Sequence, residues 1–321
     1  MTPEQALWFA DVFGRLVANV EQVVVGKTRT IQLAFTTLIS EGHLLLEDVP
    51  GTGKTSLARA VSQSIQGSTS SRIQFTPDLL PGDITGVSIF DQQAGRFEFH
   101  PGPIFANIVL ADEINRASPK TQAALLEVME ESHVTVDGVE HAVAPPFMVI
   151  ATQNPIEQSG TYELPEAQLD RFLIKTSLGY PDHASTMRIL ETAALRSSDV
   201  TVPAVVPERV ILEMAKLART VHVDATVLDY ISRLVDATRS VSEVRLGASV
   251  RGALALVRAA KTWAASSGRH YVIPDDVKAM AEPVLSHRLL LDPEAEFDGV
   301  TASAVIGQVL LETPPPGDRA A

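Results

Sequence analysis

The chain has 321 residues, a length that suits two domains, and its 26 Lys and Arg residues against 39 Asp and Glu residues give a formal net charge of −13 at pH 7. This acidic balance argues against an extended contact with nucleic acid or with an anionic membrane, although it leaves room for a local basic patch. The sequence contains no cysteine, which excludes disulfides, thiolate zinc sites and a cysteine nucleophile.

The first stretch of the chain predicts a helix rather than a targeting segment. Residues 3–22 carry acidic side chains early and lack the apolar core and cleavage site of a signal peptide. The turn VVVG at 23–26 ends this helix, and a second helix is expected over residues 28–41. No run of about 18 apolar residues occurs in the sequence, so we expect no membrane span and a cytoplasmic protein.

Residues 43–55, which read HLLLEDVPGTGKT, have the order of a phosphate-binding loop, or P-loop. A short apolar strand over residues 43–46 is followed by a glycine-rich turn, and an amphipathic helix opens at Lys54 and Thr55. Strand, turn and helix in this order are the context that such a motif requires. We interpret the stretch as a binding site for a nucleoside triphosphate; the alternative is a chance Gly/Pro loop before a helix.

The chemistry of this turn depends on backbone N–H groups that converge on phosphate oxygens at a helix N-terminus. Gly51 and Gly53 permit positive φ and a close approach of the backbone. Lys54 is expected to reach the β- and γ-phosphates, and the Thr55 hydroxyl to bind Mg²⁺. The usual first glycine of the motif falls at Asp48, which departs from the pattern. The expected phosphate-binding residues are Pro50, Gly51, Thr52, Gly53, Lys54, Thr55 and Ser56.

The segment after the P-loop helix predicts one strand and an inserted hairpin. Residues 72–75 form the strand, and residues 76–103 are dense in glycine and proline. Within them, GVSIF and RFEFH alternate around the turn-like sequence DQQAG, so a β-hairpin is expected at 84–100. An insertion of this kind is unusual in a plain α/β crossover and indicates a functional loop.

Residues 107–113, which read NIVLADE, are apolar almost throughout, as expected of a strand that is buried on both faces. The strand ends in Asp112 and Glu113. Beside a P-loop strand, Asp112 can hold the Mg²⁺ shell and Glu113 can orient and deprotonate a water molecule. The alternative is a pair of solvated loop acids.

The next part of the chain predicts a helix over 117–131, a hairpin at 133–143 and a strand over 147–154. The strand ends in Asn154, at the sheet edge where ligands bind in open α/β folds. We therefore expect Asn154 to contact the attacking water or the γ-phosphate. The alternative is a turn-forming Asn before Pro155.

A strand over residues 172–178 completes the predicted sheet, and no strand pattern follows Asp182. Helices are expected at about 183–196, 207–220, 224–239, 248–266 and 274–285. The predicted fold is therefore of the α/β class, in three parts. These are a parallel five-stranded α/β nucleotide-binding domain with β-hairpin inserts over residues 1–182, a smaller all-α domain over 183–312, and a disordered tail over 313–321.

Five long motifs are more specific than these patterns. The chain closely resembles the MoxR family of AAA+ ATPases over roughly residues 15–300, in the motifs DVPGTGKT, FTPDLLPGDITG, FHPGPIFANIVLADEINRASPKTQAALLEVMEE, ATQNPIEQSGTYELPEAQLDRF and GASVRGALALVRAAK. The resemblance implies an AAA+ P-loop domain with a helical lid, in which the two hairpins are a helix-2 insert and a pre-sensor-1 hairpin. It also implies ATP and Mg²⁺ as cofactors and hydrolysis of ATP to ADP and phosphate.

The resemblance implies roles for single residues. Lys54 and Thr55 match the Walker A lysine and its Mg²⁺-binding neighbour. Asp112 and Glu113 match the Walker B pair, with Asp112 at the metal and Glu113 as the catalytic base. Asn154 matches the residue called sensor 1.

Other positions match the family outside the P-loop and strand ends. Arg171, in LDRF, resembles the arginine finger that reaches the γ-phosphate of a neighbouring subunit. Arg251, in GASVRGA, resembles sensor 2, which reaches from the lid to the nucleotide. Val25 and Gly26 fall where such proteins hold the adenine, and Arg116 is a weaker candidate for an intersubunit or sensor contact.

Physical chemistry supports the arginine roles without deciding them. A planar guanidinium fork suits the charge that develops on a transferring phosphoryl group. From spacing alone, Arg171 could instead form a surface ion pair with Asp170 or Glu166. Arg251 could equally be a charge on a helix face.

The resemblance implies a hexameric ring that uses ATP hydrolysis for chaperone-like remodelling, maturation or activation of partner protein complexes, often with a von Willebrand factor A-domain protein. A nucleic-acid motor is one alternative, since related AAA+ members include helicases. The net charge of −13 and the lack of a basic aromatic cluster in the sequence argue against it. A nucleotide-gated binding switch, in which ATP occupancy rather than turnover matters, is the other alternative.

Overall fold

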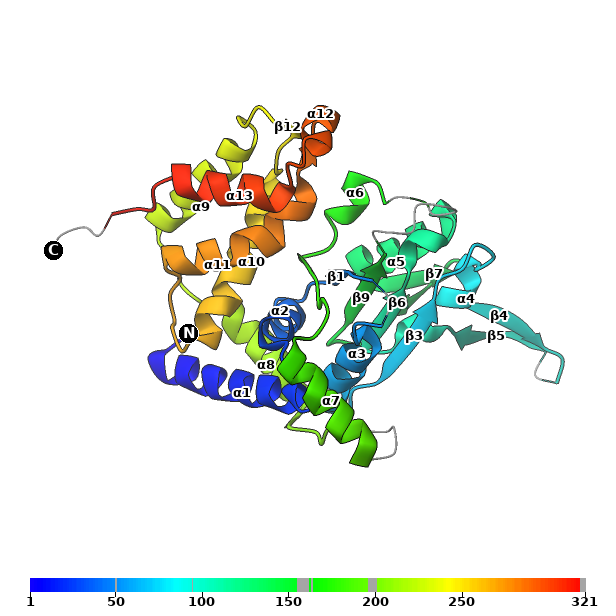
Figure 1. Ribbon diagram of the computed structural model, residues 1–321. Helices are drawn as coiled ribbons and strands as arrows, with labels where there is room; N and C mark the ends of the chain where they lie inside the picture. The colour runs from blue at the N-terminus through cyan, green and yellow to red at the C-terminus, as the bar shows by residue number, and fades with distance from the viewer. Residues whose placement is uncertain (50, 94, 155–161, 163, 196–200, 318–321) are drawn as a thin grey trace. The chain divides into compact units, whose positions relative to one another are not determined.

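The computed structural model describes residues 1–49, 51–93, 95–154, 162, 164–195 and 201–317 (Figure 1). The chain forms two compact units that alternate along the sequence. We call the first the sheet unit; it comprises Arg15–Leu164 and Thr176–Leu212. We call the second the helical unit; it comprises Met1–Gly14, Pro165–Lys175 and Glu213–Ala321.

A five-stranded sheet has the strand order β10-β1-β9-β6-β3. Its strands are β1 (Leu44–Glu47), β3 (Ser70–Gln74), β6 (Ile108–Asp112), β9 (Met148–Gln153) and β10 (Ile174–Thr176). The pairs β1–β9, β9–β6 and β6–β3 are parallel. Every residue of β6 is buried, as the apolar run in its sequence predicts for a central parallel strand. The predicted parallel α/β fold is thus confirmed.

The register of the strands sets which residues meet at the functional edge. Gln74 at the end of β3 pairs with Asp112 at the end of β6, and Glu47 at the end of β1 pairs with Gln153 of β9. Because the carboxyl ends of parallel strands meet at one edge of a sheet, the residues that follow these strands lie near each other. The P-loop, Glu113 and Asn154 follow such strand ends, and Asp112 is the last residue of β6.

Helices of the sheet unit match the predicted segments. They are α2 (Thr28–Ile39), α3 (Lys54–Gln63), α5 (Pro119–Glu131), α7 (His183–Leu195) and the end of α1 (Pro3–Glu21), from Arg15 onward. The start of α5 follows from its sequence: the Ser118 side chain accepts a hydrogen bond from the Thr121 N–H, and Pro119 stands in the first turn, where its missing N–H is not needed.

Two antiparallel hairpins confirm the predicted inserts. One consists of β4 (Gly86–Asp91) and β5 (Arg96–Pro101), after the short helix α4 (Pro81–Thr85), and in Figure 1 it extends away from the sheet. The other consists of β7 (His133–Val136) and β8 (Val139–Ala142). The rings of Phe99 on β5 and His141 on β8 stack with centroids 3.8 Å apart, so the two inserts contact each other.

The helical unit is built from α9 (Ala225–Thr238), α10 (Val250–Ser266), α11 (Pro274–Leu285) and α13 (Ala302–Glu312), with the short helices α6 (Glu166–Leu169) and α12 (Pro293–Phe297). Helix α10 packs against α9 and α11. Tyr230, Leu256 and Met280 are fully buried between these helices. The last segment of this unit, Glu213–Ala321, begins within α8 (Glu208–Arg219).

Short strands after Asp182 correct the expectation that none would follow. β11 (Val206–Pro207) pairs in parallel with β2 (Ile65–Gln66), and β12 (Val244–Leu246) pairs antiparallel with β13 (Leu290–Leu291). Strands of two or three residues are too short to leave an alternating pattern in the sequence, which is why periodicity missed them.

Among the described residues, no helix combines the length and apolarity that a membrane crossing would need. Of the predicted tail 313–321, residues 318–321 lie outside the described residues. Thr313 is buried, and its N–H donates a hydrogen bond to Val309 O at the end of α13.

Candidate functional site

The glycine-rich turn has the backbone that a phosphate loop needs. Gly51 and Gly53 have φ of 84° and 95°, a left-handed conformation that favours glycine. A Cβ at either position would meet no atom within 4 Å, so the conformation rather than crowding requires glycine there. Helix α3 begins at Lys54 without a side-chain cap, which leaves its first N–H groups facing the loop as an anion site requires. Pro50 lies outside the described residues.

Asp48, which stands where the usual motif has glycine, anchors the start of the loop. Its buried carboxylate accepts hydrogen bonds from the N–H groups of Leu178 and Gly179, in the segment after β10. These bonds offset the cost of burying a charge. Its backbone carbonyl accepts a 3.2 Å hydrogen bond from Lys54 Nζ, and Lys54 is 8% exposed.

The hydroxyl side chains of the loop differ in exposure. Thr52 is buried and donates to Val49 O at 3.4 Å, so it braces the turn from inside. Thr55 and Ser56 in the first turn of α3 are exposed. An exposed hydroxyl beside the first N–H groups of a helix can contact a phosphate or its metal.

Asp112 ends β6 with its carboxylate held on both sides. Thr152 Oγ1 donates to Asp112 Oδ1 at 2.7 Å, and Arg72 Nη2 forms a 2.6 Å ion pair with Asp112 Oδ2. Thr152 Oγ1 in turn accepts a 2.8 Å hydrogen bond from the Glu113 N–H. The hydroxyl thus fixes Asp112 and the backbone of Glu113 together.

Glu113 adopts a left-handed conformation, with φ of 59° and ψ of 50°, which is uncommon for a residue with a side chain. Its Oε2 accepts a 2.9 Å hydrogen bond from Gln74 Nε2 and lies 3.2 Å from Arg116 Nε in an ion pair. Strained backbone conformations concentrate at functional sites, where the surrounding bonds maintain them. Arg116, the weaker sequence candidate, therefore lies beside the candidate base.

Sequence reasoning missed Arg72, Gln74 and Thr152. Arg72 and Gln74 stand two residues apart on β3, so their side chains share one face of the strand, and Arg72 Nη2 donates to Gln74 Oε1 at 2.7 Å. The register that pairs Gln74 with Asp112 brings both beside the two acids. The sequence shows the alternation of polar and apolar side chains at Arg72, Ile73 and Gln74, but it does not show which strand pairs with them.

The fit of a divalent cation can be judged from the oxygen atoms at this edge. No group of three or more His, Cys, Asp and Glu side chains within the described ranges could hold a metal ion. Mg²⁺ is usually bound by one or two carboxylates together with substrate phosphates and water, rather than by a complete cage of side chains. Asp112 and Thr55 fit that kind of site, and Arg72 supplies positive charge to Asp112 here.

Asn154 follows β9 and is buried, with 6% exposure. Because β9 lies between β1 and β6 in the sheet, Asn154 follows the strand between the P-loop strand and the strand of Asp112. Gly26 has φ of 73°, and a Cβ there would lie 2.2 Å from Ser185 Oγ, so the backbone passes very close to α7. Val25 beside it is partly exposed.

Arg171 and Arg251 belong to the helical unit, whereas the P-loop and the two acids belong to the sheet unit. Arg251 stands in the first turn of α10, and its side chain is 53% exposed. Arg251 Nε lies 3.9 Å from Asp170 Oδ2. Asp170, considered above as a possible surface partner of Arg171, has its carboxylate against Arg288 and Arg251.

Two known protein families match separate parts of the chain. The ATPase family associated with various cellular activities (AAA) matches residues 43–174, a range that contains the P-loop, Asp112, Glu113, Asn154 and Arg171. The AAA lid domain matches residues 236–309, which include Arg251.

Several relatives match the chain over most of its length. An uncharacterized protein named YeaC from Bacillus subtilis is 46% identical over 310 residues, which is 97% of each chain. Chaperone MoxR1 from Mycobacterium tuberculosis is 42% identical, over 92% of this chain and 80% of that protein. Protein MoxR from Paracoccus denitrificans is 33% identical, over 87% of this chain and 88% of that protein. A crystal structure of a protein from Cytophaga hutchinsonii superimposes with a TM-score of 0.91, at 37% identity and 98% coverage of both chains.

Proposed function

This chain belongs to the MoxR family of AAA+ ATPases and hydrolyses ATP, and from that premise we propose that its ATP turnover drives chaperone-like remodelling, maturation or activation of partner protein complexes. The observation that carries the proposal is the joined set of side chains at the sheet edge. Arg72, Gln74 and Thr152 fix Asp112 and Glu113 at the end of β6, one strand away from the strand that leads into the P-loop. Catalysis of phosphoryl transfer consists mostly of positioning the reacting groups and stabilising charge, and a pair of carboxylates held in place suits that task.

We assign the chemical steps to the following residues. Lys54 and the N–H groups at the start of α3 bind the phosphates, and Asp112 with the Thr55 hydroxyl would hold Mg²⁺. When bound, the metal would neutralise charge that develops on the phosphates. Glu113 orients the attacking water and accepts its proton, and Asn154 contacts the water or the γ-phosphate.

Arg171 and Arg251 complete the proposed machinery. We assign Arg171 to the γ-phosphate of a neighbouring subunit and Arg251 to the nucleotide of its own subunit. An arginine supplied in trans makes hydrolysis depend on assembly, because an isolated subunit lacks one of the groups that stabilise the transition state. ATP turnover per subunit should therefore rise with protein concentration until the assembly is complete.

We propose residues 1–182 as the nucleotide-binding domain and residues 183–312 as the helical lid. The matches at 43–174 and 236–309 support this division, since each falls within one of the two segments. The adenine is assigned to Val25 and Gly26, where the close backbone approach to α7 forms a tight corner.

The assembly is proposed to be a homo-hexamer that acts on a protein with a von Willebrand factor A domain. The name of the relative Chaperone MoxR1 supports a protein client. The two contacting hairpin inserts offer a surface beyond the nucleotide site, on which Ile89, Phe90 and Phe97 are half or more exposed. Net acidic charge makes a nucleic-acid client the weaker choice.

The test is capture of the client by a subunit that binds ATP without hydrolysing it. Glu113→Gln should hold the ATP-bound assembly, because the water then lacks its base. Lysate of the native host is passed over this variant with and without ATP, with Lys54→Ala as the matched control. A partner that appears only with ATP and only on Glu113→Gln supports the proposal. ATP turnover stimulated by DNA or RNA would favour a nucleic-acid motor, and full biological activity of Glu113→Gln would favour a binding switch.

A further inference from the structure

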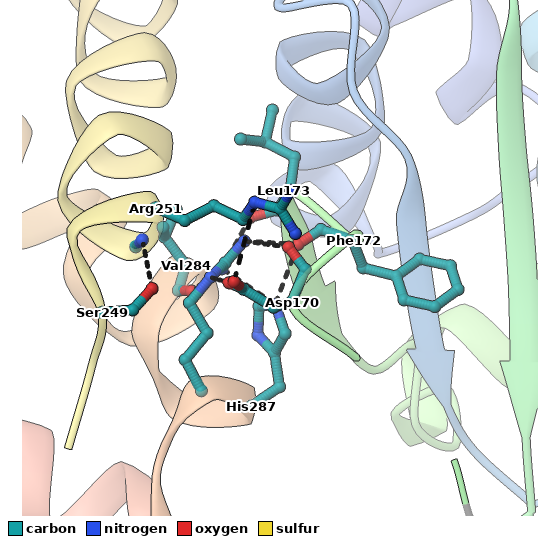
Figure 2. A network of polar contacts seen from close by, with 9 residues as sticks. Asp170, Phe172, Leu173, Ser249, Arg251, Val284 and His287 are labelled. Carbon is teal, nitrogen blue, oxygen red and sulfur yellow. Dashed lines mark hydrogen bonds and ion pairs between the residues drawn. The ribbon is translucent and has the colours of Figure 1, made fainter. Parts of the chain in front are cut away.

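Arg288 is a buried cation whose partners lie far away in the sequence. It ends the 3₁₀ helix Ser286–Arg288 directly after α11, and its side chain is 3% exposed. Nε donates to Asp170 Oδ1 at 2.7 Å, and Nη2 donates to Phe172 O at 2.7 Å and to Asp170 O at 3.2 Å. Nη1 donates to Leu173 O at 3.4 Å. Figure 2 shows Asp170, Phe172 and Leu173 gathered around these contacts, all within the helical unit.

These contacts fix the backbone on both sides of Arg171. The carbonyl before it, of Asp170, and the carbonyl after it, of Phe172, accept hydrogen bonds from the same nitrogen of Arg288. A guanidinium presents its donors in a rigid plane, so it sets the direction of both carbonyls at once. The peptide unit before Arg171 and the one between Phe172 and Leu173 are therefore held by one side chain.

His287 makes a second side-chain contact with the same segment. Burial lowers the pKa of its imidazole well below the ordinary value, and the neighbouring charge of Arg288 acts in the same direction. The ring is therefore neutral near pH 7, and its Nε2 lies 3.0 Å from Phe172 O and 2.9 Å from Arg288 Nη1. Figure 2 shows His287 below Asp170 and Phe172.

The same arginine also supports the start of α10, which carries Arg251. A Cβ on Gly252 would lie 3.1 Å from Arg288 Cδ, so glycine lets α10 approach the aliphatic part of Arg288 closely. Asp170 Oδ2, the oxygen not bound by Arg288, faces Arg251 Nε at 3.9 Å. Asp170 therefore lies between the two arginines.

The two ion pairs of Asp170 differ in strength. The pair with Arg288 is short and its arginine is buried, and breaking such a pair is strongly unfavourable because it leaves a buried charge without a partner. The pair with Arg251 is long, and the Arg251 side chain is 53% exposed, so water screens it. Arg251 can therefore leave Asp170 for a phosphate while Arg288 keeps Asp170 neutralised.

We propose that Arg288 is a positioning residue of the ATPase, which holds Arg171 and the start of α10 with Arg251 in one fixed arrangement through Asp170. The inference rests on the roles proposed above for Arg171 and Arg251. It assigns to the network a function beyond stability: Arg288 holds the backbone around Arg171 through its guanidinium, and it supports the start of α10, which carries Arg251, through its aliphatic part and through Asp170.

Assemblies of two different variants test separately how Arg288 supports Arg171 and how it supports the start of α10 with Arg251. Lys54→Ala subunits cannot use their own site but supply Arg171, whereas Arg171→Ala subunits keep their own site but supply no finger. Mixing them should restore ATP turnover in hybrid sites. Arg288→Lys is then added either to the Lys54→Ala subunits or to the Arg171→Ala subunits, because lysine keeps the charge and loses the planar fork. The matched control is Arg233→Lys, at an exposed ion pair with Asp229 on α9.

In the finger-supplying subunit, Arg288→Lys should lower kcat of the hybrid sites about a hundredfold and change KM for ATP less than about twofold, since a misplaced group costs about that factor. In the nucleotide-binding subunit, it should weaken the binding of a fluorescent ATP analogue several-fold. Arg233→Lys should change neither quantity. Equal hybrid turnover and equal nucleotide binding for Arg288→Lys and Arg233→Lys would overturn the proposal.

Two further measurements keep the outcome decisive. If Arg288→Lys fails to assemble, Asp170→Asn replaces it, because the amide oxygen still accepts from Arg288 Nε while the charge that faces Arg251 is lost. The loss of the charge that neutralises Arg288 should lower hybrid turnover when this variant supplies Arg171, and it should change the binding of the analogue when this variant binds the nucleotide. Hybrid turnover and nucleotide binding both equal to those of Arg233→Lys would overturn the proposal. If the parent mixture shows no restored turnover, the trans role of Arg171 is wrong. The positioning role is then decided by whether Arg288→Lys alone binds the analogue more weakly than Arg233→Lys.

Discussion

Asp48→Ala should destabilise the sheet unit while leaving the phosphate loop able to bind ATP. The substitution removes the carboxylate that accepts from the N–H groups of Leu178 and Gly179. A hydrogen bond to a charged group contributes about 1.5–3 kcal/mol, and a buried N–H left without a partner loses that amount. Leu178 is buried whereas Gly179 is partly exposed, so water can replace one of the two bonds. We therefore expect the free energy of unfolding to fall by about 2–4 kcal/mol.

Hydrogen exchange at the two amides is the assay that localises this loss, with urea unfolding as the global measurement. A local loss of about 1.5–3 kcal/mol should speed exchange of the Leu178 amide about ten- to a hundredfold. Asp48→Asn keeps one acceptor oxygen and should lose about half as much. ATP affinity should change little, because Lys54 is bound by the backbone carbonyl of Asp48, which every substitution keeps.

A matched control is Asp83→Ala, where an exposed carboxylate accepts from the Leu80 N–H. Water can replace that bond, so the loss should stay below about 1 kcal/mol. The reasoning is refuted if Asp48→Ala costs no more than Asp83→Ala and leaves exchange of the Leu178 amide unchanged.

Three further predictions address the two acids and the buried histidine. Glu113→Gln should keep ATP binding and lower phosphate release about 10²–10⁴-fold, whereas an unchanged rate would remove Glu113 as the base. Arg72→Ala should lower the free energy of unfolding of the nucleotide-free protein by less than about 1 kcal/mol, because Arg72 is half exposed, and it should enlarge the rise in melting temperature on adding MgATP. The control is Arg96→Ala, at the exposed ion pair with Glu98. An equal rise for both variants would contradict the argument that Arg72 pairs with Asp112 when no nucleotide is bound. The pKa of His287 is lowered by burial and by the charges of Arg288 and Lys175, so the unfolded chain takes up a proton near pH 6.5 that the folded chain does not. The free energy of unfolding should therefore be undiminished above pH 6.5 and fall by up to about 1.4 kcal/mol per pH unit below it. His287→Gln should remove this part of the dependence of the unfolding free energy on pH, measured by urea titration at several pH values. An unchanged dependence would contradict the assignment of this effect to His287.

Local patterns predicted the features that depend on neighbours in the sequence. The P-loop requires a strand, a glycine turn and a helix within 43–55, and the hairpin at 133–143 requires only Asp137 and Gly138 between alternating residues. The apolar run of β6 predicted a strand buried on both faces, and the structure confirms it. In these cases the residues that determine the structure lie within a few positions of it.

The network around the two acids depended on register, which a single sequence does not reveal. Arg72 and Gln74 reach Asp112 and Glu113 only because β3 pairs with β6 so that Gln74 lies opposite Asp112. A shift of one residue would turn both side chains to the other face of the sheet. Thr152 likewise contributes only through the pairing of β9 with β6.

Asp48 and Arg288 illustrate why the remaining anchors gave no signal. The chain passes from the helical unit to the sheet unit between Lys175 and Thr176, inside β10. Before this crossing, Arg288 donates to the carbonyls of residues 170, 172 and 173, and after it Asp48 accepts from the N–H groups of residues 178 and 179. Each charged side chain binds main-chain groups of its own unit. Every residue has such groups, so no residue type marks the partner, and a buried Arg or Asp in the sequence looks like an ordinary surface charge.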